Sequence, residues 1–140
     1  MLKLYLIVLL FLLSGCAPIP HFERISPEVE GIVLNKNTPV PNALVSVINE
    51  DNIKKTMTDK DGKFHIDEAY KFHFFKVFGD TGYKWELVIE HNGKTYLGME
   101  ELILGPARDY VSTECQIDTE EMLKKRNRLK YIPDYYGICY

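Results

Sequence analysis

The sequence holds little of what would mark several classes of protein. Its 140 residues include three cysteines and one tryptophan, and they show no excess of positive charge. Lys and Arg number 17 against 20 Asp and Glu, so the formal net charge is −3. Nucleic-acid binding relies on contacts between phosphates and a net basic surface. The charge balance therefore excludes nucleic acid as a partner.

The first apolar run is too short to cross a membrane. It extends without a break over residues 4–13, and as a helix it would cover about 15 Å of the roughly 30 Å of hydrocarbon. Lys3 precedes this run, and the small residues Ser14 and Gly15 follow it. A positive charge, a short apolar core and small residues at a cleavage site are typical of a secretory signal. We therefore expect residues 1–15 to be a signal peptide.

The end of this signal resembles a lipidation motif. The residues Leu13-Ser14-Gly15-Cys16 are similar to the bacterial lipobox, in which the cysteine thiol receives a diacylglyceryl group before cleavage. The resemblance implies that Cys16 is lipidated. The prolines at 18, 20 and 27 and the lack of periodicity then predict an extended tether over residues 16–28. Two or three acyl chains form a stable membrane anchor, at about 0.8 kcal/mol per buried methylene. An ordinary signal peptide and a retained anchor are the alternatives.

The residue that follows the expected lipidation site predicts the membrane to which the protein is sorted. By resemblance to enteric lipoproteins, Ala17 implies sorting to the outer membrane, because it is not aspartate. The protein is then expected to face the periplasm from that membrane.

The other two cysteines are Cys115 and Cys139. In an oxidising compartment, an even number of remaining cysteines favours a disulfide. Such a bond would tie the C-terminal tail to the body of the domain and contribute about 3 kcal/mol by loop entropy. Two buried free thiols are the alternative.

Short segments with a period of two dominate the middle of the chain. Turn residues separate them, as in an all-β fold. The pair Asn92-Gly93 is typical of a type I′ hairpin turn, in which both central residues have positive φ. The sequence predicts one domain over residues 29–118, an antiparallel β-sandwich of about seven strands. The expected strands cover residues 31–35, 43–50, 53–58, 63–67, 84–90, 94–99 and 110–117.

The C-terminal residues 119–140 follow a different pattern. Asp118 is a suitable helix cap, and Glu121 three residues later completes a capping-box spacing. We expect a short helix over residues 119–129 and an aromatic tail that packs back on the sandwich through Cys139. The basic run over residues 124–130 forms a solvated helix face or contacts anionic headgroups.

Three motifs in the first half resemble a known family. They are G-x-V, P-V-x-x-A-x-V and T-D-x-D-G-x-F, present here as Gly31-Ile32-Val33, Pro39-Val40-Pro41-Asn42-Ala43-Leu44-Val45 and Thr58-Asp59-Lys60-Asp61-Gly62-Lys63-Phe64. In this order they resemble the carboxypeptidase regulatory-like domain, a transthyretin-like β-sandwich. The resemblance covers roughly residues 30–67. It implies a module that assists, anchors or binds and that needs no cofactor.

Residues that could carry chemistry form no convincing catalytic or metal site. Asp59-Lys60-Asp61-Gly62 invites a calcium interpretation, but Met57 stands where the first carboxylate ligand of an EF-hand loop is required. The four histidines match no zinc-ligand spacing, and His65 is expected on a solvent face. No G-x-S-x-G motif is present. The chain also ends in Gly137-Ile138-Cys139-Tyr140, unlike the Tyr-Arg-Gly-Ser end of the hydroxyisourate hydrolases on a transthyretin fold. We therefore expect no enzyme and no metal.

The most unusual segment is residues 70–78, which holds five aromatic side chains. One interpretation is a core strand that buries Tyr70, Phe72 and Phe74. The other is an exposed aromatic patch that binds a partner protein or a sugar ring. Phe75 and Phe78 fall off the alternation. The possible partner-binding residues are Phe72, Phe75 and Phe78.

The sequence therefore leads to three hypotheses. The first is a non-catalytic envelope lipoprotein that docks onto another envelope protein or serves as a structural module. The second is a glycan- or peptidoglycan-binding module that uses the aromatic patch. The third is an accessory lipoprotein of a secretion apparatus, because type VI secretion lipoproteins pair a lipobox with a transthyretin-like sandwich.

Overall fold

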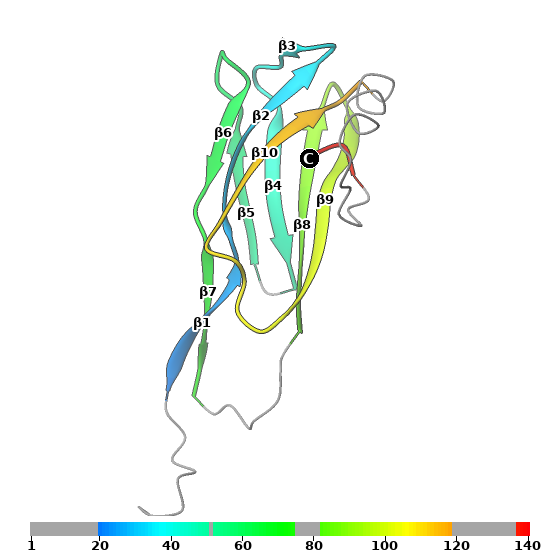
Figure 1. The fold of residues 1–140 in the computed structure, drawn as a ribbon. Coiled ribbons are helices and arrows are strands. Elements are labelled where there is room, and N and C mark those ends of the chain that lie inside the picture. The colour runs from blue at the N-terminus through cyan, green and yellow to red at the C-terminus, as the bar shows by residue number, and fades with distance from the viewer. Residues whose placement is uncertain (1–19, 51, 75–81, 119–136) are drawn as a thin grey trace, which may run out of the picture.

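The protein folds into β-strands, as the alternating pattern predicts. The structure is a computed structural model that describes residues 20–50, 52–74, 82–118 and 137–140. Within these residues there are ten strands and no helix (Figure 1). They are β1 His21–Ser26, β2 Glu28–Asn35, β3 Thr38–Pro39, β4 Leu44–Asn49, β5 Asn52–Met57, β6 Lys63–Ile66, β7 Ala69–His73, β8 Gly82–His91, β9 Lys94–Leu104 and β10 Tyr110–Gln116.

Seven of these strands are the ones expected from sequence, namely β2, β4, β5, β6, β8, β9 and β10. The all-β prediction is thus confirmed. The short β3, and the pair formed by β1 and β7, are additional. The predicted helix over residues 119–129 lies outside the described residues, as do Cys16, Phe75 and Phe78.

The strands form two larger sheets and one two-stranded ribbon. One sheet has the order β5-β4-β8-β9, and the other joins β10, β2 and β3, with β6 also paired to β2. All pairs are antiparallel except β2 with β10, which is parallel. β4 lies between β5 and β8. Its Val45 and Val47 are buried in the core, whereas Leu44 and Ile48 on its other face are half-buried.

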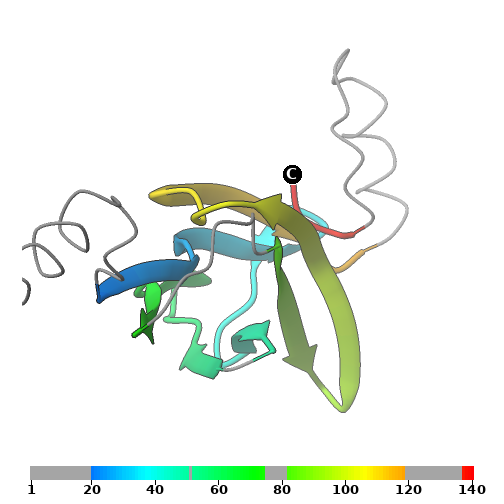
Figure 2. The same cartoon turned by 90° about the horizontal axis from the view of Figure 1, so that it is seen from below.

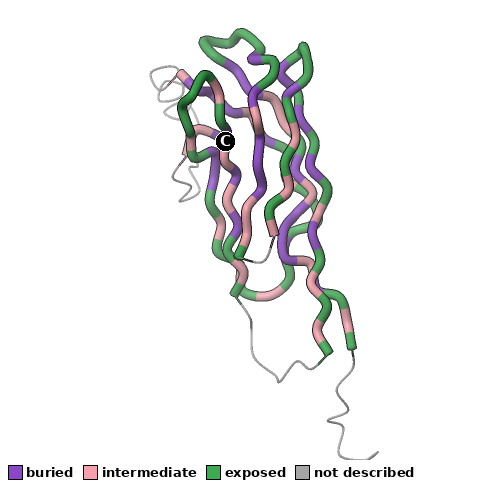
Figure 3. The backbone as a smooth tube through the Cα atoms, turned by 180° about the vertical axis from the view of Figure 1, so that it is seen from behind, coloured by how far each residue is buried: buried purple, intermediate pink, exposed green. Residues whose placement is uncertain are grey.

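The two sheets pack face to face around one core (Figure 3). β8 contributes Trp85, Leu87 and Ile89, which are all buried, and residues between them are exposed or half-buried. β6 contributes Phe64 and Ile66 in the same alternating way. Period-two alternation places these side chains on one face, and the inner faces of the sheets interdigitate. The turn at Asn92 and Gly93 has positive φ at both residues, as the hairpin motif predicts.

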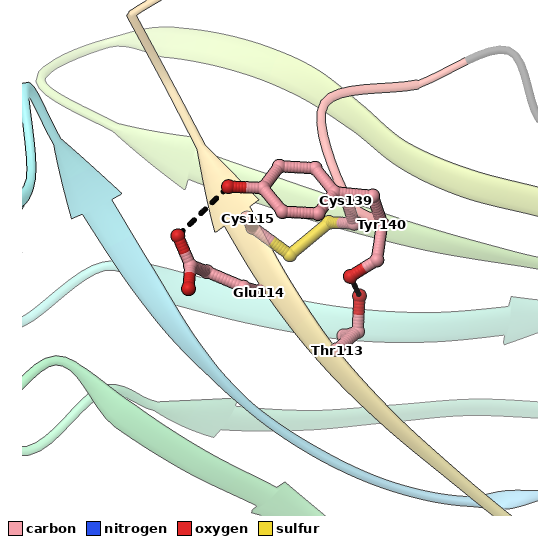
Figure 4. The surroundings of a disulfide bond; sticks show 5 residues. All are labelled: Thr113, Glu114, Cys115, Cys139 and Tyr140. Carbon is pink, nitrogen blue, oxygen red and sulfur yellow. Dashed lines mark hydrogen bonds between the residues drawn. A yellow bond between two sulfur atoms is a disulfide. The ribbon is translucent and has the colours of Figure 1, made fainter. Parts of the chain in front are cut away.

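A short C-terminal segment joins the two sheets at one edge (Figures 1 and 2). The Ile138 and Cys139 amides donate to the carbonyls of Leu97 and Gly98 on β9. On the other side, Glu114 and Tyr140 exchange two backbone hydrogen bonds on β10. Cys115 and Cys139 form a disulfide, as predicted. Figure 4 also shows Tyr140 donating its hydroxyl to Glu114.

The tether expected over residues 16–28 is shorter than the sequence suggests. Residues 21–26 form β1, which pairs with β7. Two of the prolines that suggested a tether flank this strand, with Pro20 before it and Pro27 after it. Prolines are tolerated at such positions because they need not donate to a ladder. Residues 21–26 are therefore part of the fold, and the expectation of a tether is wrong for them.

Candidate functional site

The aromatic segment lies in a two-stranded ribbon at one end of the sandwich (Figure 1). In the β1–β7 register, Phe22 is opposite Phe72 and Arg24 is opposite Tyr70. Because side chains alternate along a strand, these four residues share one face, and the exposed Phe74 follows directly after β7. We call this surface the aromatic face. Its rings are exposed, with exposed fractions of 71% for Phe22, 48% for Tyr70, 52% for Phe72 and 65% for Phe74.

These exposures decide between the two interpretations of the segment. The expectation that Tyr70, Phe72 and Phe74 form a buried strand face is wrong. They face solvent because the opposite face of the ribbon is the one that packs on the sandwich. The Phe22 and Phe72 rings contact each other, with 5.1 Å between centroids.

The opposite face of the ribbon carries a polar cluster. Tyr83, from β8, donates its hydroxyl to Glu23 at 2.9 Å and lies 3.0 Å from His73 Nε2. His73 is 3.5 Å from the same Glu23 oxygen, and His21 stacks on His73. Glu23 is only 5% exposed. Buried carboxylates require such partners, so this cluster fixes the ribbon to β8. No sequence motif pointed to it, because Glu23 and Tyr83 lie 60 residues apart in the chain.

The base of the ribbon is held by an arginine. Arg24 pairs with Asp109 and donates to the Tyr70 hydroxyl at 3.3 Å. The hydrogen bonds with Tyr70 and Asp109 raise the pKa of Arg24 above its ordinary value. A shallow groove of about 350 Å³ lies here, and Phe22, Arg24, Tyr70 and Pro106 are among its lining residues.

A second apolar surface covers the outer side of the sheet β5-β4-β8-β9. The registers place Ile53 and Met57 of β5 on the side away from the core, together with Leu97, Leu102 and Leu104 of β9. All five are exposed. We call this surface the outer sheet face. Of the ten exposed large apolar side chains among the described residues, these five and the four rings of the aromatic face make nine.

Charged residues separate the apolar ones on the outer sheet face. Lys84 pairs with Glu86 at 2.8 Å and with Glu100 at 3.2 Å. Hydrogen bonds to Glu86 and then Glu100 raise the pKa of Lys84. The lysine therefore stays protonated over the physiological range and bridges β8 to β9.

The histidines do not converge. His65 is half exposed and lies near Glu28 and Asp67 on the sheet surface, whereas His73 belongs to the ribbon cluster. Over residues 20–50, 52–74, 82–118 and 137–140, no group of three or more metal-ligating side chains could hold an ion. In the same residues, no helix is long and apolar enough to span a membrane.

One family model matches the chain. It is described as a domain of unknown function, DUF6795, and it aligns with residues 29–102, which is 74 of the 140 residues. The chain belongs to the DUF6795 family. No curated protein matches it in sequence. The DUF6795 region begins within β2 and ends within β9, so β1, β10 and the disulfide lie outside it.

The sequence motifs of the DUF6795 region meet at one end of the sandwich. The Thr58 hydroxyl accepts from the Ala43 amide at 2.8 Å and donates to the Val40 carbonyl at 2.7 Å. Asp59 Oδ1 accepts from the amides of residues 61 and 63, which forms the predicted turn. Gly62 adopts φ +73°, where a side chain would be strained and would meet a backbone oxygen. These motifs therefore have a structural role.

Replacing Thr58 with valine tests this role. The isosteric change removes a buried hydroxyl and leaves the Ala43 amide and the Val40 carbonyl without this partner. Each unsatisfied buried group costs about 1–3 kcal/mol, so we expect Thr58→Val to lower the free energy of unfolding by about 2–3 kcal/mol in urea titration. Thr56→Val, on the preceding strand at a half-buried position, is the matched control. Equal stability of the two variants would contradict the prediction.

Proposed function

We propose that this protein is a non-catalytic envelope lipoprotein, anchored by acyl chains on Cys16, that acts as a protein-docking module. The sequence supports the anchor through its signal-like start and its lipobox-like residues 13–16. The β-sandwich supports a binding role, because sandwiches of the transthyretin-like kind that the motifs resemble usually assist other proteins. The acyl chains would hold the domain at the outer membrane, facing the periplasm.

The observation that carries the docking proposal is the outer sheet face. A sheet face that is turned to water normally carries polar residues. Here Leu44, Ile48 and Val88 on the two central strands are half-buried and apolar, and they connect the exposed side chains of β5 to those of β9. Exposed apolar surface of this extent marks protein interaction sites, and here it also holds the charged residues Lys84, Glu86 and Glu100.

Charge substitutions on β5 test the docking surface in intact cells. A photo-crosslinker at Leu97 should capture one stoichiometric envelope protein. Ile53→Lys with Met57→Lys should reduce that adduct by about tenfold or more, because two apolar anchors are lost and charges are placed in the interface. Adduct yield by immunoblot is the measurement.

The control is Lys55→Ala, which changes a side chain between the two anchors on the same strand. It should leave the adduct intact. An unchanged adduct in the Ile53/Met57 variant, many weak adducts, or retention on purified cell-wall material without any protein adduct would each refute docking through this face.

Glycan binding is the second candidate function, and the groove at the ribbon base favours it. Phe22 and Tyr70 offer rings for stacking on a sugar, and Arg24 offers donors for its hydroxyls. Retention on purified glycans that Phe22→Ser abolishes would support this role.

A further inference from the structure

We infer that the aromatic face of the ribbon lies in the headgroup region of the membrane that carries the lipid anchor. The inference rests on the proposed lipidation of Cys16, and it assigns a partner to a surface that protein docking through the outer sheet face does not use. The partner is a lipid surface of zwitterionic or mixed headgroups, contacted through rings rather than through charge.

The ribbon has one covered side and one open side. Glu23, His73 and Tyr83 fasten its inner side to the sandwich. The outer side presents Phe22, Phe72 and two further rings to solvent, and the free end of the ribbon is exposed or half-buried in Figure 3. The Phe22–Phe72 contact supports the ribbon itself, but a cluster of exposed rings also marks an interaction surface.

The short chain between the proposed anchor and the ribbon indicates which partner contacts the aromatic face. β1 begins at His21, five residues after Cys16. A fully extended chain covers at most about 3.6 Å per residue, so this distance is no more than about 18 Å. Phe22 is the next residue. Acyl chains on Cys16 would therefore hold the aromatic face within about 20 Å of the headgroups at all times.

This tether makes the bilayer the most concentrated partner that the face can meet. Tethering converts weak binding into an intramolecular event with a high effective concentration. Aromatic rings with a polar neighbour suit the membrane–water interface. Tyr70 supplies a hydroxyl, and Arg24 lies over its ring at 5.6 Å from the centroid. The arginine charge is already paired with Asp109, so ring contacts dominate.

Seating the ribbon in the interface also orients the domain. The ribbon is at one end of the long axis along which the sandwich strands run (Figure 1). The turn at Asn92 and Gly93 and the turn at Asp59 to Gly62 lie toward the far end, because β8 runs from the ribbon end to the first turn and β6 runs from the second turn back toward the ribbon. The outer sheet face then stands upright on the membrane and stays open to a protein partner.

Fluorescence depth measurement tests the inference on the full chain. The chain carrying Phe72→Trp is purified from cells and placed in zwitterionic vesicles that contain lipids brominated on the acyl chain. The introduced indole should be quenched and its emission shifted to the blue. Leu97→Trp, exposed on the outer sheet face, should show little quenching. Adding Phe22→Ser to Phe72→Trp should reduce quenching several-fold, because the opposing ring is lost.

Mass measurement of the same sample separates the anchor from the ring contact. An acylated chain without quenching of the Phe72→Trp indole overturns the inference and leaves the anchor standing. Quenching in an unacylated chain supports the ring contact and refutes the anchor. Loss of quenching in about 1 M salt, where the Debye length is about 3 Å, would assign the contact to charge and also overturn the inference. Glycan retention that depends on Phe22, without quenching, would overturn it in favour of a sugar ligand.

Discussion

Replacing Cys115 and Cys139 with serine should lower the free energy of unfolding by about 3 kcal/mol. The bond closes a loop between residues 24 apart, and loop entropy in the unfolded chain accounts for a contribution of this size. Both cysteines are buried, so the serine hydroxyls must also find partners in an apolar site. Urea unfolding followed by circular dichroism measures the loss. Reducing the native protein with a thiol should produce nearly the same shift.

The disulfide matters beyond its entropy because the C-terminal segment bridges β9 and β10. Ile138, Cys139 and Tyr140 make backbone hydrogen bonds to both strands. Without the bond these amides should exchange with solvent faster than those of β8. Tyr140→Phe is the matched control, since it removes only the hydroxyl bond to Glu114 and should cost about 0.5–1.5 kcal/mol. If reduction left stability unchanged, the segment would be docked by its hydrogen bonds alone.

Much of the fold could be predicted from the sequence because burial alternates cleanly in several strands. Trp85, Leu87 and Ile89 on β8 alternate with more exposed neighbours, which is the direct signature of a sheet with one face in the core. The turn at Asn92 and Gly93 could be predicted because positive φ favours those residues. The disulfide followed from elimination, once Cys16 was assigned to lipid.

The ribbon could not be predicted because its pairing is long-range. β1 and β7 are separated by more than forty residues, and neither segment carries a pattern that identifies its pairing partner. Prolines at residues 18, 20 and 27 suggested a tether, although two of them only bound a strand. The sequence of the aromatic segment is compatible with a buried strand and with an exposed one. Which side faces water depends on Glu23 and Tyr83, contributed by other strands.

The candidate site was therefore found only in part. Phe72, a possible partner-binding residue from the sequence, lies on the aromatic face, while Phe22, its partner across the ribbon, was missed because it lay in the presumed tether. The outer sheet face was also missed. Ile53 and Met57 share their face with Lys55, whereas Lys54 and Thr56 lie on the other face. Each face of β5 thus carries one lysine, and the sequence does not tell which face points to the core.

Trp85→Ala is expected to have the largest effect on stability of any single substitution discussed for this protein. The indole is only 1% exposed, and it packs in the core on β8 between β4 and β9. Truncating a buried tryptophan costs about 3–5 kcal/mol through lost transfer energy and the cavity that remains. Against a total stability of about 5–15 kcal/mol for a domain, this loss is a large fraction, and it would unfold a domain at the lower end of that range. Circular dichroism is the appropriate probe, because this is the chain's single tryptophan.

Two comparisons separate the packing of Trp85 from its hydrogen bond. The indole nitrogen donates to Glu101 at 3.2 Å, and Glu101 also pairs with Arg108. Trp85→Phe removes this hydrogen bond and part of the ring system. Its loss of stability should be less than half of the loss in Trp85→Ala, since burial of apolar surface dominates. Leu104→Ala, at a position 75% exposed on the outer sheet face, should change stability by less than about 0.5 kcal/mol. Equal losses for Trp85→Ala and Leu104→Ala would mean that the two sheets do not enclose Trp85 as described. A loss ordered as expected would show that the indole packed between the two sheets contributes far more to stability than an exposed leucine of the outer sheet face.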